Sequence, residues 1–305
     1  MGPVKSKFQQ AMEPWPALAD FGKQNKLVGS DLELYYFEAG DHSQKHLLMV
    51  HGLGDEADTW RHVFLPLSQD FHVLALDLPG FGRSDQPDVK YTAEYMIEAL
   101  MGLLDQCNIP NTILMGSSLG GILAHAMSLT YPERVTGLVL IGGAVLQLEP
   151  MQGWSLRLMR LPLIGEWLYT RLRKDPDAAF ASLNSVYHQL EALPEADRDF
   201  LYVRVNQRVW SDEQRRAYFS TLRQLAPWLK RNQADWKAKL AHLPTPTLVV
   251  RGEYDSLYSE SNADALVKMQ PNITKAVIQD AGHLPHQENP GGFLQAIQPW
   301  LINQS

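Results

Sequence analysis

Short apolar runs alternate with amphipathic stretches along most of this 305-residue chain. The apolar runs predict strands near residues 32–38, 46–50, 72–76, 112–116, 135–141, 246–251 and 273–279. Apolar positions at helical spacing predict helices near residues 58–68, 92–107, 119–131, 259–269 and 290–302. Continuously apolar strands that alternate with helices indicate an α/β fold, in which a mostly parallel sheet has helices on both faces.

Residues 145–243 break this alternation. They contain no strand pattern, and helical spacing dominates near 154–174, 176–193, 195–208, 211–225 and 233–241. Five of the eight tryptophans of the chain fall within this segment. We therefore expect residues 145–243 to form a helical cap domain, inserted into an α/β core that is built from residues 1–144 and 244–305.

The motif Gly116-Ser117-Ser118-Leu119-Gly120 lies between a predicted strand and a predicted helix. In that context G-x-S-x-G indicates a nucleophile elbow, a turn so tight that the residues two before and two after the nucleophile must be small. Around Ser118 those residues are Gly116 and Gly120, whereas around Ser117 they would be much larger. Ser118 is therefore the predicted nucleophile.

A serine hydroxyl needs a base to remove its proton and an acid to orient that base. Asp255 follows the strand predicted at 246–251, and His283 follows the strand at 273–279. The order Ser118, Asp255, His283 is the nucleophile–acid–histidine order of one hydrolase fold. Glu253 is the local rival for the acid, and His286 lies farther from its strand end than His283.

Attack on a carbonyl also requires donors for the developing oxyanion. The backbone N–H of Leu119 follows the elbow at the positive end of the outgoing helix. The loop His51-Gly52-Leu53-Gly54 follows an earlier strand, and its glycines allow the backbone to approach closely. The N–H groups of Leu53 and Leu119 are thus the predicted oxyanion hole.

These motifs together make the chain resemble the α/β-hydrolase superfamily, in its branch with a helical cap inserted after the sixth strand. The matching pieces also include Asp77-Leu78-Pro79-Gly80-Phe81-Gly82-Arg83-Ser84 and Pro132-Glu133-Arg134-Val135. The resemblance implies that Ser118 is the nucleophile, His283 the general base and Asp255 its orienting acid. One departure is Ser256-Leu257-Tyr258 after the acid, where many relatives carry a proline.

The composition of the chain limits the kinds of partner and cofactor that we expect. A net charge of −7 without a basic cluster argues against a nucleic-acid partner. The single cysteine, Cys107, rules out an internal disulfide. No group of His, Cys, Asp and Glu has metal-ligand spacing along the sequence, so we expect neither a metal nor another cofactor. The sequence does not indicate an oligomeric state.

The first residues lack the apolar core of a secretory signal, and no run of about 18 apolar residues occurs. We therefore expect a cytoplasmic protein without a membrane span. An aromatic-rich cap favours a small-molecule substrate with a sizeable apolar portion. The candidate substrate-binding residues are Leu146, Leu148, Met151, Trp154, Met159 and Trp210.

The favoured interpretation is a serine hydrolase that cleaves carboxylic esters of moderately apolar substrates through an acyl-enzyme on Ser118. Similar capped proteins use the same triad to cleave carbon–carbon bonds next to a ketone, as in meta-cleavage product hydrolases, to release N-terminal proline or to form peracids. Epoxide and haloalkane hydrolysis are disfavoured because those branches need a carboxylate at position 118. A third alternative is a receptor that only binds, but such proteins usually lose a triad member, and none is lost here.

Overall fold

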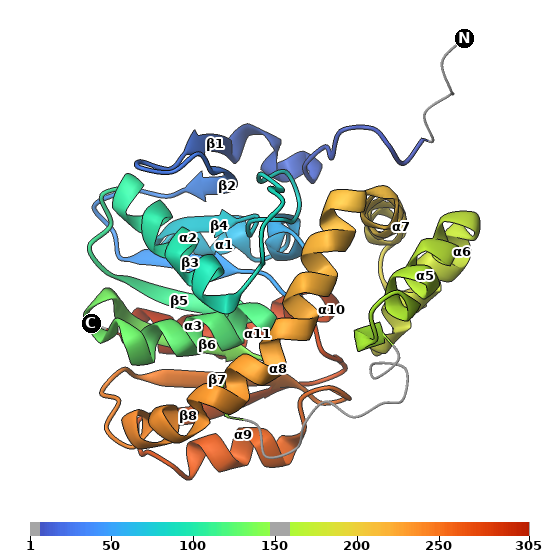
Figure 1. Ribbon diagram of the computed structural model, residues 1–305. Helices are drawn as coiled ribbons and strands as arrows, with labels where there is room; N and C mark the ends of the chain where they lie inside the picture. The colour runs from blue at the N-terminus through green and yellow to red at the C-terminus, as the bar shows by residue number, and fades with distance from the viewer. Residues whose placement is uncertain (1–6, 147–158, 305) are drawn as a thin grey trace.

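The computed structural model describes residues 7–146 and 159–304. Within them, eight strands form one sheet in the order β1-β2-β4-β3-β5-β6-β7-β8 (Figure 1). The strands are β1 Gly22–Lys26, β2 Glu33–Ala39, β3 His46–Val50, β4 His72–Leu76, β5 Thr112–Ser117, β6 Val135–Ile141, β7 Thr247–Gly252 and β8 Ile273–Ile278. The mostly parallel sheet that the sequence predicts is therefore confirmed.

In this order, the six strands β4, β3, β5, β6, β7 and β8 pair in parallel. At one edge, β1 pairs antiparallel with β2, and β2 pairs antiparallel with β4. The central strands β4, β5 and β7 are buried at every position, which explains their unbroken apolar runs. The hydrophobic pattern did not predict β1. Its residues Gly22-Lys23-Gln24-Asn25-Lys26 are almost all exposed at the sheet edge, so its position depends on backbone pairing with β2 rather than on hydropathy.

Helices cover both faces of the sheet. The α-helices are α1 Phe64–Leu67, α2 Ala93–Gln106, α3 Leu119–Thr130, α5 Ile164–Arg171, α6 Pro176–Ala181, α7 Glu195–Trp210, α8 Asp212–Leu240, α9 Glu260–Val267, α10 Pro285–Glu288 and α11 Pro290–Ile302. The 3-10 helices are η1 Pro16–Phe21, η2 Ala57–Trp60, η3 Pro132–Arg134, η4 Leu172–Lys174, η5 Ser182–Ser185 and η6 Leu190–Ala192.

One hydrophobic cluster joins α2, α3 and α8 to the face of the sheet seen in Figure 1. A second cluster joins η2, α1 and α11 to the opposite face.

The helix predicted at 58–68 is split into η2 and α1. A continuous helix would need a hydrogen bond from the backbone N–H of residue 66 to the carbonyl of residue 62, and Pro66 has no N–H to donate.

The described residues between β6 and β7 contain only helices and turns. α5, α6 and α7 lie together beside the sheet, and α8 runs from them back across its face (Figure 1). The two helices predicted at 211–225 and 233–241 are parts of this single 29-residue helix. Trp228, Trp236 and Leu240 in its second half belong to the core cluster. We propose that the cap begins after β6 and that α8 leads the chain back into the core.

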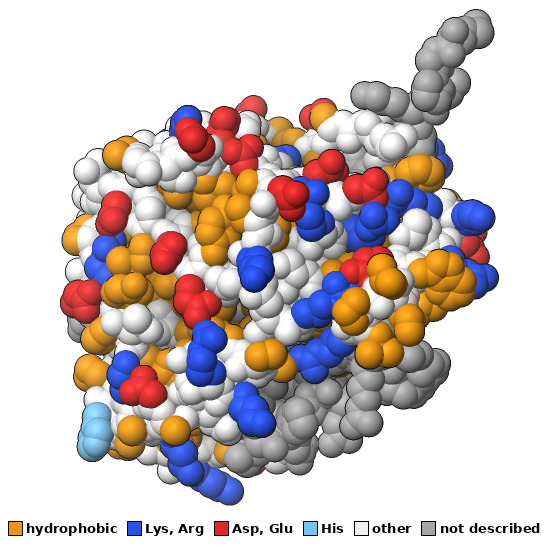
Figure 2. All heavy atoms as spheres, viewed as in Figure 1, with side chains coloured by type: hydrophobic (Ala, Val, Ile, Leu, Met, Phe, Trp, Pro, Cys, Tyr) orange, Lys and Arg blue, Asp and Glu red, His pale blue; other side chains and the backbone are white. Residues whose placement is uncertain are grey.

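No helix in the described ranges combines the length and the apolar character that crossing a membrane requires. Figure 2 shows acidic and basic side chains mixed on the face seen there, with hydrophobic side chains exposed among them. The exposed large hydrophobic residues of the described cap include Leu161, Leu163, Ile164 and Trp167, at or just before α5.

Candidate active site

Ser118 lies in a strained turn between β5 and α3. Its φ of 53° and ψ of −113° fall in a region that L-residues rarely adopt. The Ser118 N–H donates to the carbonyl of Ile141 at 2.7 Å, which ties the turn to β6. A Cβ added at Gly116 would collide with the backbone of Gly120, and one at Gly120 would collide with the carbonyl of Val50. The small flanking residues that the motif predicts are thus required by the packing.

Asp255 and His283 form a buried pair. His283 Nδ1 lies 3.0 Å from both Oδ1 and Oδ2 of Asp255. Asp255 Oδ1 also accepts the N–H groups of Leu257 and Tyr258, each at 2.9 Å. Since a carboxylate can only accept, His283 carries its proton on Nδ1 and presents a lone pair on Nε2. Among the described residues, this buried Nε2 has no hydrogen-bond partner.

Two consecutive glycines after β6 pack against the histidine ring and against the elbow. A Cβ added at Gly142 would lie 2.8 Å from His283 Cε1, and one at Gly143 would collide with the Ser118 carbonyl. Because neighbouring Cα atoms are about 3.8 Å apart, the imidazole and the elbow both lie next to this glycine pair, at the carboxyl ends of the parallel strands. Gly142 also has φ of +60°, which favours glycine. Neither glycine belongs to a motif that was recognised in the sequence.

The loop after β3 lies against the elbow. A Cβ added at Gly52 would lie 3.3 Å from Ser118 Cβ. His51 Nε2 accepts the N–H of Leu78 at 2.8 Å, so its proton is on Nδ1, which donates to the Gly52 carbonyl at 2.7 Å. In a trans peptide the carbonyl and the following N–H point in opposite directions. His51 therefore turns the Gly52 carbonyl toward its own ring and the Leu53 N–H away from it.

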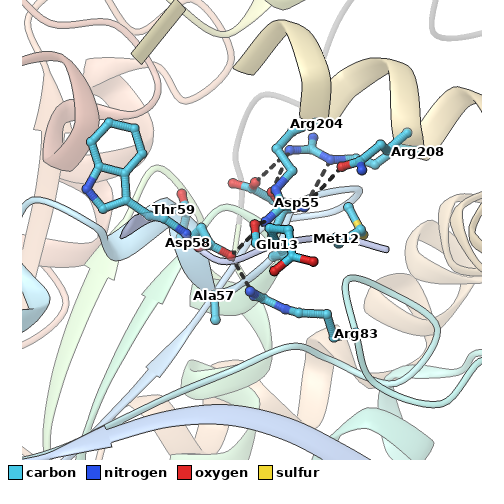
Figure 3. Close-up of polar contacts among 12 residues, drawn as sticks. Met12, Glu13, Asp55, Ala57, Asp58, Thr59, Arg83, Arg204 and Arg208 are labelled. Carbon is cyan, nitrogen blue, oxygen red and sulfur yellow. Dashed lines mark hydrogen bonds and ion pairs between the residues drawn. The ribbon is translucent and has the colours of Figure 1, made fainter. Parts of the chain in front are cut away.

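Arg208 of α7 connects the cap to this loop (Figure 3). Its Nη1 donates to the Gly54 carbonyl at 2.6 Å, and its Nε and Nη2 donate to the Glu56 carboxylate at 3.0 and 3.1 Å. Burial alone would raise the pKa of Glu56, but Arg208 and Arg204 hold it below its usual value. In the same group of charged side chains, Arg83 Nη2 lies 2.5 Å from Asp58 Oδ2 (Figure 3).

The cap also contacts the loop that carries His283. The His283 N–H donates to the carbonyl of Val186 at 2.9 Å. Glu288 accepts the Gly282 N–H at 2.8 Å and the His188 N–H at 2.7 Å, so one carboxylate links the cap segment to the base loop. These contacts were not predicted, because their residues are far apart in the sequence and belong to no motif.

A sequence model of the α/β hydrolase fold family matches residues 45–290. The chain belongs to the α/β-hydrolase fold family. It is 26% identical to the 2-hydroxy-6-oxo-6-(2'-aminophenyl)hexa-2,4-dienoic acid hydrolase of Metapseudomonas resinovorans, over 90% of this chain and 89% of that protein.

Solved structures agree with the family assignment. A thermophilic esterase from Thermogutta terrifontis is 25% identical, with a TM-score of 0.73, over 93% of this chain and 98% of the esterase chain. A putative lipase from Acinetobacter baumannii AYE shares the fold with a TM-score of 0.78 and 21% identity, over 99% and 97% of the two chains.

In this α/β-hydrolase, the surroundings of His286 and Glu253, the rival candidates for the base and the acid, differ from those of His283 and Asp255. His286 is fully buried, with its Nε2 3.0 Å from Thr59 Oγ1 and its ring 4.4 Å from that of Trp60. Burial, together with Arg61, holds the pKa of His286 well below its usual value. Glu253 is exposed and accepts the N–H of Asp280, whereas the buried Asp255 contacts the histidine. We therefore retain Asp255 and His283 as the candidates.

Of the predicted substrate-binding residues, Leu148, Met151 and Trp154 lie outside the described residues. Leu146 is half-buried and packs against the same hydrophobic cluster as Leu53 of the predicted oxyanion hole.

Met159 and Trp210 lie on the cap. The Met159 carbonyl lies against Gly165 at the start of α5. Trp210 ends α7 and lines a cavity of about 490 Å³ shared with residues 8–12. The guanidinium of Arg173 lies 5.5 Å from the Trp210 ring centroid. Roles of Leu146, Met159 and Trp210 in substrate binding remain predictions.

Proposed function

We propose that this α/β-hydrolase cleaves carboxylic esters with moderately apolar groups through an acyl-enzyme on Ser118. The main support is the buried His283, whose Nδ1 is held by Asp255 and whose Nε2 is without a partner in the described part of the chain. This lone pair lies on a ring beside a serine in a strained elbow. A triad of this kind activates a hydroxyl for acyl transfer.

In the proposed reaction, His283 Nε2 accepts the Ser118 proton while Oγ bonds to the ester carbonyl carbon. The oxyanion receives hydrogen bonds from the N–H groups of Leu53 and Leu119; Leu119 begins α3, where the first N–H groups have no acceptor within the helix. Protonated His283 then gives its proton to the leaving alcohol. Water, deprotonated by the same nitrogen, then attacks the acyl-enzyme. The bond between the acyl carbon and Oγ breaks, Ser118 regains the proton from His283, and the acid leaves.

Carbon–carbon bond hydrolysis is the second candidate. It is supported by the similarity to the Metapseudomonas resinovorans hydrolase, whose name describes a dienoic acid substrate, over 90% of this chain. A 2-hydroxy-6-oxo-dienoate could use the same serine, base and oxyanion donors. A ketone carbon would then replace the ester carbonyl as the site of attack.

The test compares the wild type with Ser118→Ala and with Ser117→Ala as a matched control from the same turn. A panel of p-nitrophenyl esters and a 2-hydroxy-6-oxo-dienoate would be offered to each variant. We expect Ser118→Ala to lower ester turnover by several orders of magnitude. We expect Ser117→Ala to retain most activity.

Labelling by a fluorophosphonate should require Ser118 and not Ser117. Ester turnover above a tenth of the wild-type rate in Ser118→Ala would refute the nucleophile. Faster cleavage of the dienoate than of any ester would replace the proposed substrate class. Failure of the wild type to react with the probe and with every substrate would favour a protein that only binds.

A further inference from the structure

A group of histidines lies at the amino ends of the parallel strands β3 and β4, the end of the sheet opposite the triad. His46 is the first residue of β3, His72 is the first residue of β4, and Glu38 lies near the end of the antiparallel strand β2. His42 is in the turn between β2 and β3. Because β3 spans about 13 Å at 3.3 Å per residue, this group is separated from the loop that follows the same strand beside Ser118.

The side chains converge on one carboxylate oxygen. Glu38 Oε1 lies 2.9 Å from His42 Nε2 and 2.9 Å from His72 Nε2. The two imidazole rings lie 3.8 Å apart at an angle of 32°, so their Nε2 atoms face the same point. All three donor atoms lie within 4.8 Å of one another. The side chains of His72 and Glu38 are 0% and 7% exposed, whereas that of His42 is 60% exposed.

We propose that Glu38, His42 and His72 form a binding site for a divalent transition metal ion such as Zn²⁺. Imidazole nitrogen and carboxylate oxygen are common zinc ligands, at about 2.0–2.2 Å from the ion. Two ligands of a tetrahedral ion are then about 3.3 Å apart, so the present 2.9 Å contacts need to open by only about 0.4 Å. Water fills the fourth position, and the exposed His42 leaves a path for entry.

His46 gives independent support. Its Nδ1 lies 2.9 Å from Nδ1 of His72. A histidine that binds a metal through one nitrogen commonly donates its other N–H to a neighbouring acceptor, which fixes the ring. Here His72 would bind the metal through Nε2 and donate Nδ1–H to His46. No short motif marks this site in the sequence, because its ligands come from two strands and a turn.

Lys23 opposes the ion. Its Nζ lies 2.5 Å from Glu38 Oε2, the oxygen that does not face the histidines. The ammonium therefore repels a cation and shares the carboxylate. Removal of the Lys23 ammonium should therefore strengthen metal binding. If Glu38 served only to pair with Lys23, that removal would not increase the affinity for the metal.

The experiment titrates Zn²⁺ into tag-free protein in competition with a chromophoric chelator. We expect one ion per chain in the wild type. His42→Ala should weaken binding at least tenfold, since even loss of a supporting partner typically costs 10–100-fold. His242→Ala, which removes another exposed histidine outside the group, should bind like the wild type. Lys23→Gln should bind more tightly. Co²⁺ should give the absorption bands of a tetrahedral site.

His42 and His242 are both exposed, so circular dichroism should show that their alanine variants are folded. Absence of stoichiometric binding in the wild type, or equal affinity in His42→Ala and His242→Ala, would overturn the proposal. Ser118→Ala should bind zinc like the wild type. The metal site and the proposed esterase activity can therefore fail independently.

Discussion

A buried histidine beneath the elbow makes the stability of the protein depend on pH. His125 lies in α3, is 0% exposed, and neither ring nitrogen has a hydrogen-bond partner among the described residues. Burial disfavours the charged imidazolium and lowers the pKa of His125 to about 4, from a usual value of about 6.5. His125→Leu keeps a side chain of similar size and removes the titrating group.

The direction of the change in stability with pH follows from proton binding. Between about pH 4 and pH 6.5 the unfolded chain protonates His125 while the folded chain does not, so the free energy of unfolding rises with pH through this window. At pH 5 these two pKa values correspond to about 2 kcal/mol of stability lost relative to pH 7. The loss is complete below about pH 4 and absent well above pH 6.5.

The assay is urea unfolding at pH 7 and pH 5, followed by tryptophan fluorescence. The difference between the two free energies of unfolding should be about 2 kcal/mol smaller in His125→Leu than in the wild type. Exposed His242, changed to Gln, serves as the control and should leave that difference unchanged. Equal pH dependence in the wild type and in His125→Leu would refute the reasoning, whatever the stability of the variant at pH 7.

Three further changes test the contacts around the site. Arg208→Met removes the bond to the Gly54 carbonyl and should lower kcat on the best ester at least tenfold, with a stability loss of about 3 kcal/mol measured by urea unfolding. Glu288→Gln should lower kcat several-fold, because an amide nitrogen replaces one of two acceptors; unchanged kinetics would argue against a positioning role. Gly120→Ala should abolish most activity and lower Tm, whereas Gly291→Ala, with open space around its Cα, should do neither.

Hydrophobic patterning predicted most of the sheet because its central strands are buried on both faces. β3, β4, β5, β6 and β7 are almost wholly buried, and each of them ends within a residue or two of its predicted position. The elbow was equally accessible from sequence, since its tight turn demands glycines at fixed spacing around Ser118. Both features are local, because a few consecutive residues contain the whole physical requirement.

The remainder depends on contacts between distant segments. β1 has no apolar alternation and is held by pairing with β2. The Arg208 contact to Gly54 joins residues 154 positions apart, and no property of an arginine on a polar helix indicates which carbonyl it will reach. The grouping of Glu38 with His72 likewise requires β2 and β4 to be neighbours in the sheet, although β3 lies between them in sequence.

The helical insertion therefore contacts the loops that carry the candidate catalytic groups. On one side, Arg208 holds the carbonyl that follows the predicted oxyanion donor Leu53. On the other, the Val186 carbonyl accepts the His283 N–H. Both contacts involve backbone groups of the core loops, so a shift of the cap would displace the predicted oxyanion donor and the candidate base together. We infer that cap position and catalytic competence are coupled, and that variants which loosen the cap will lower kcat before they unfold the core.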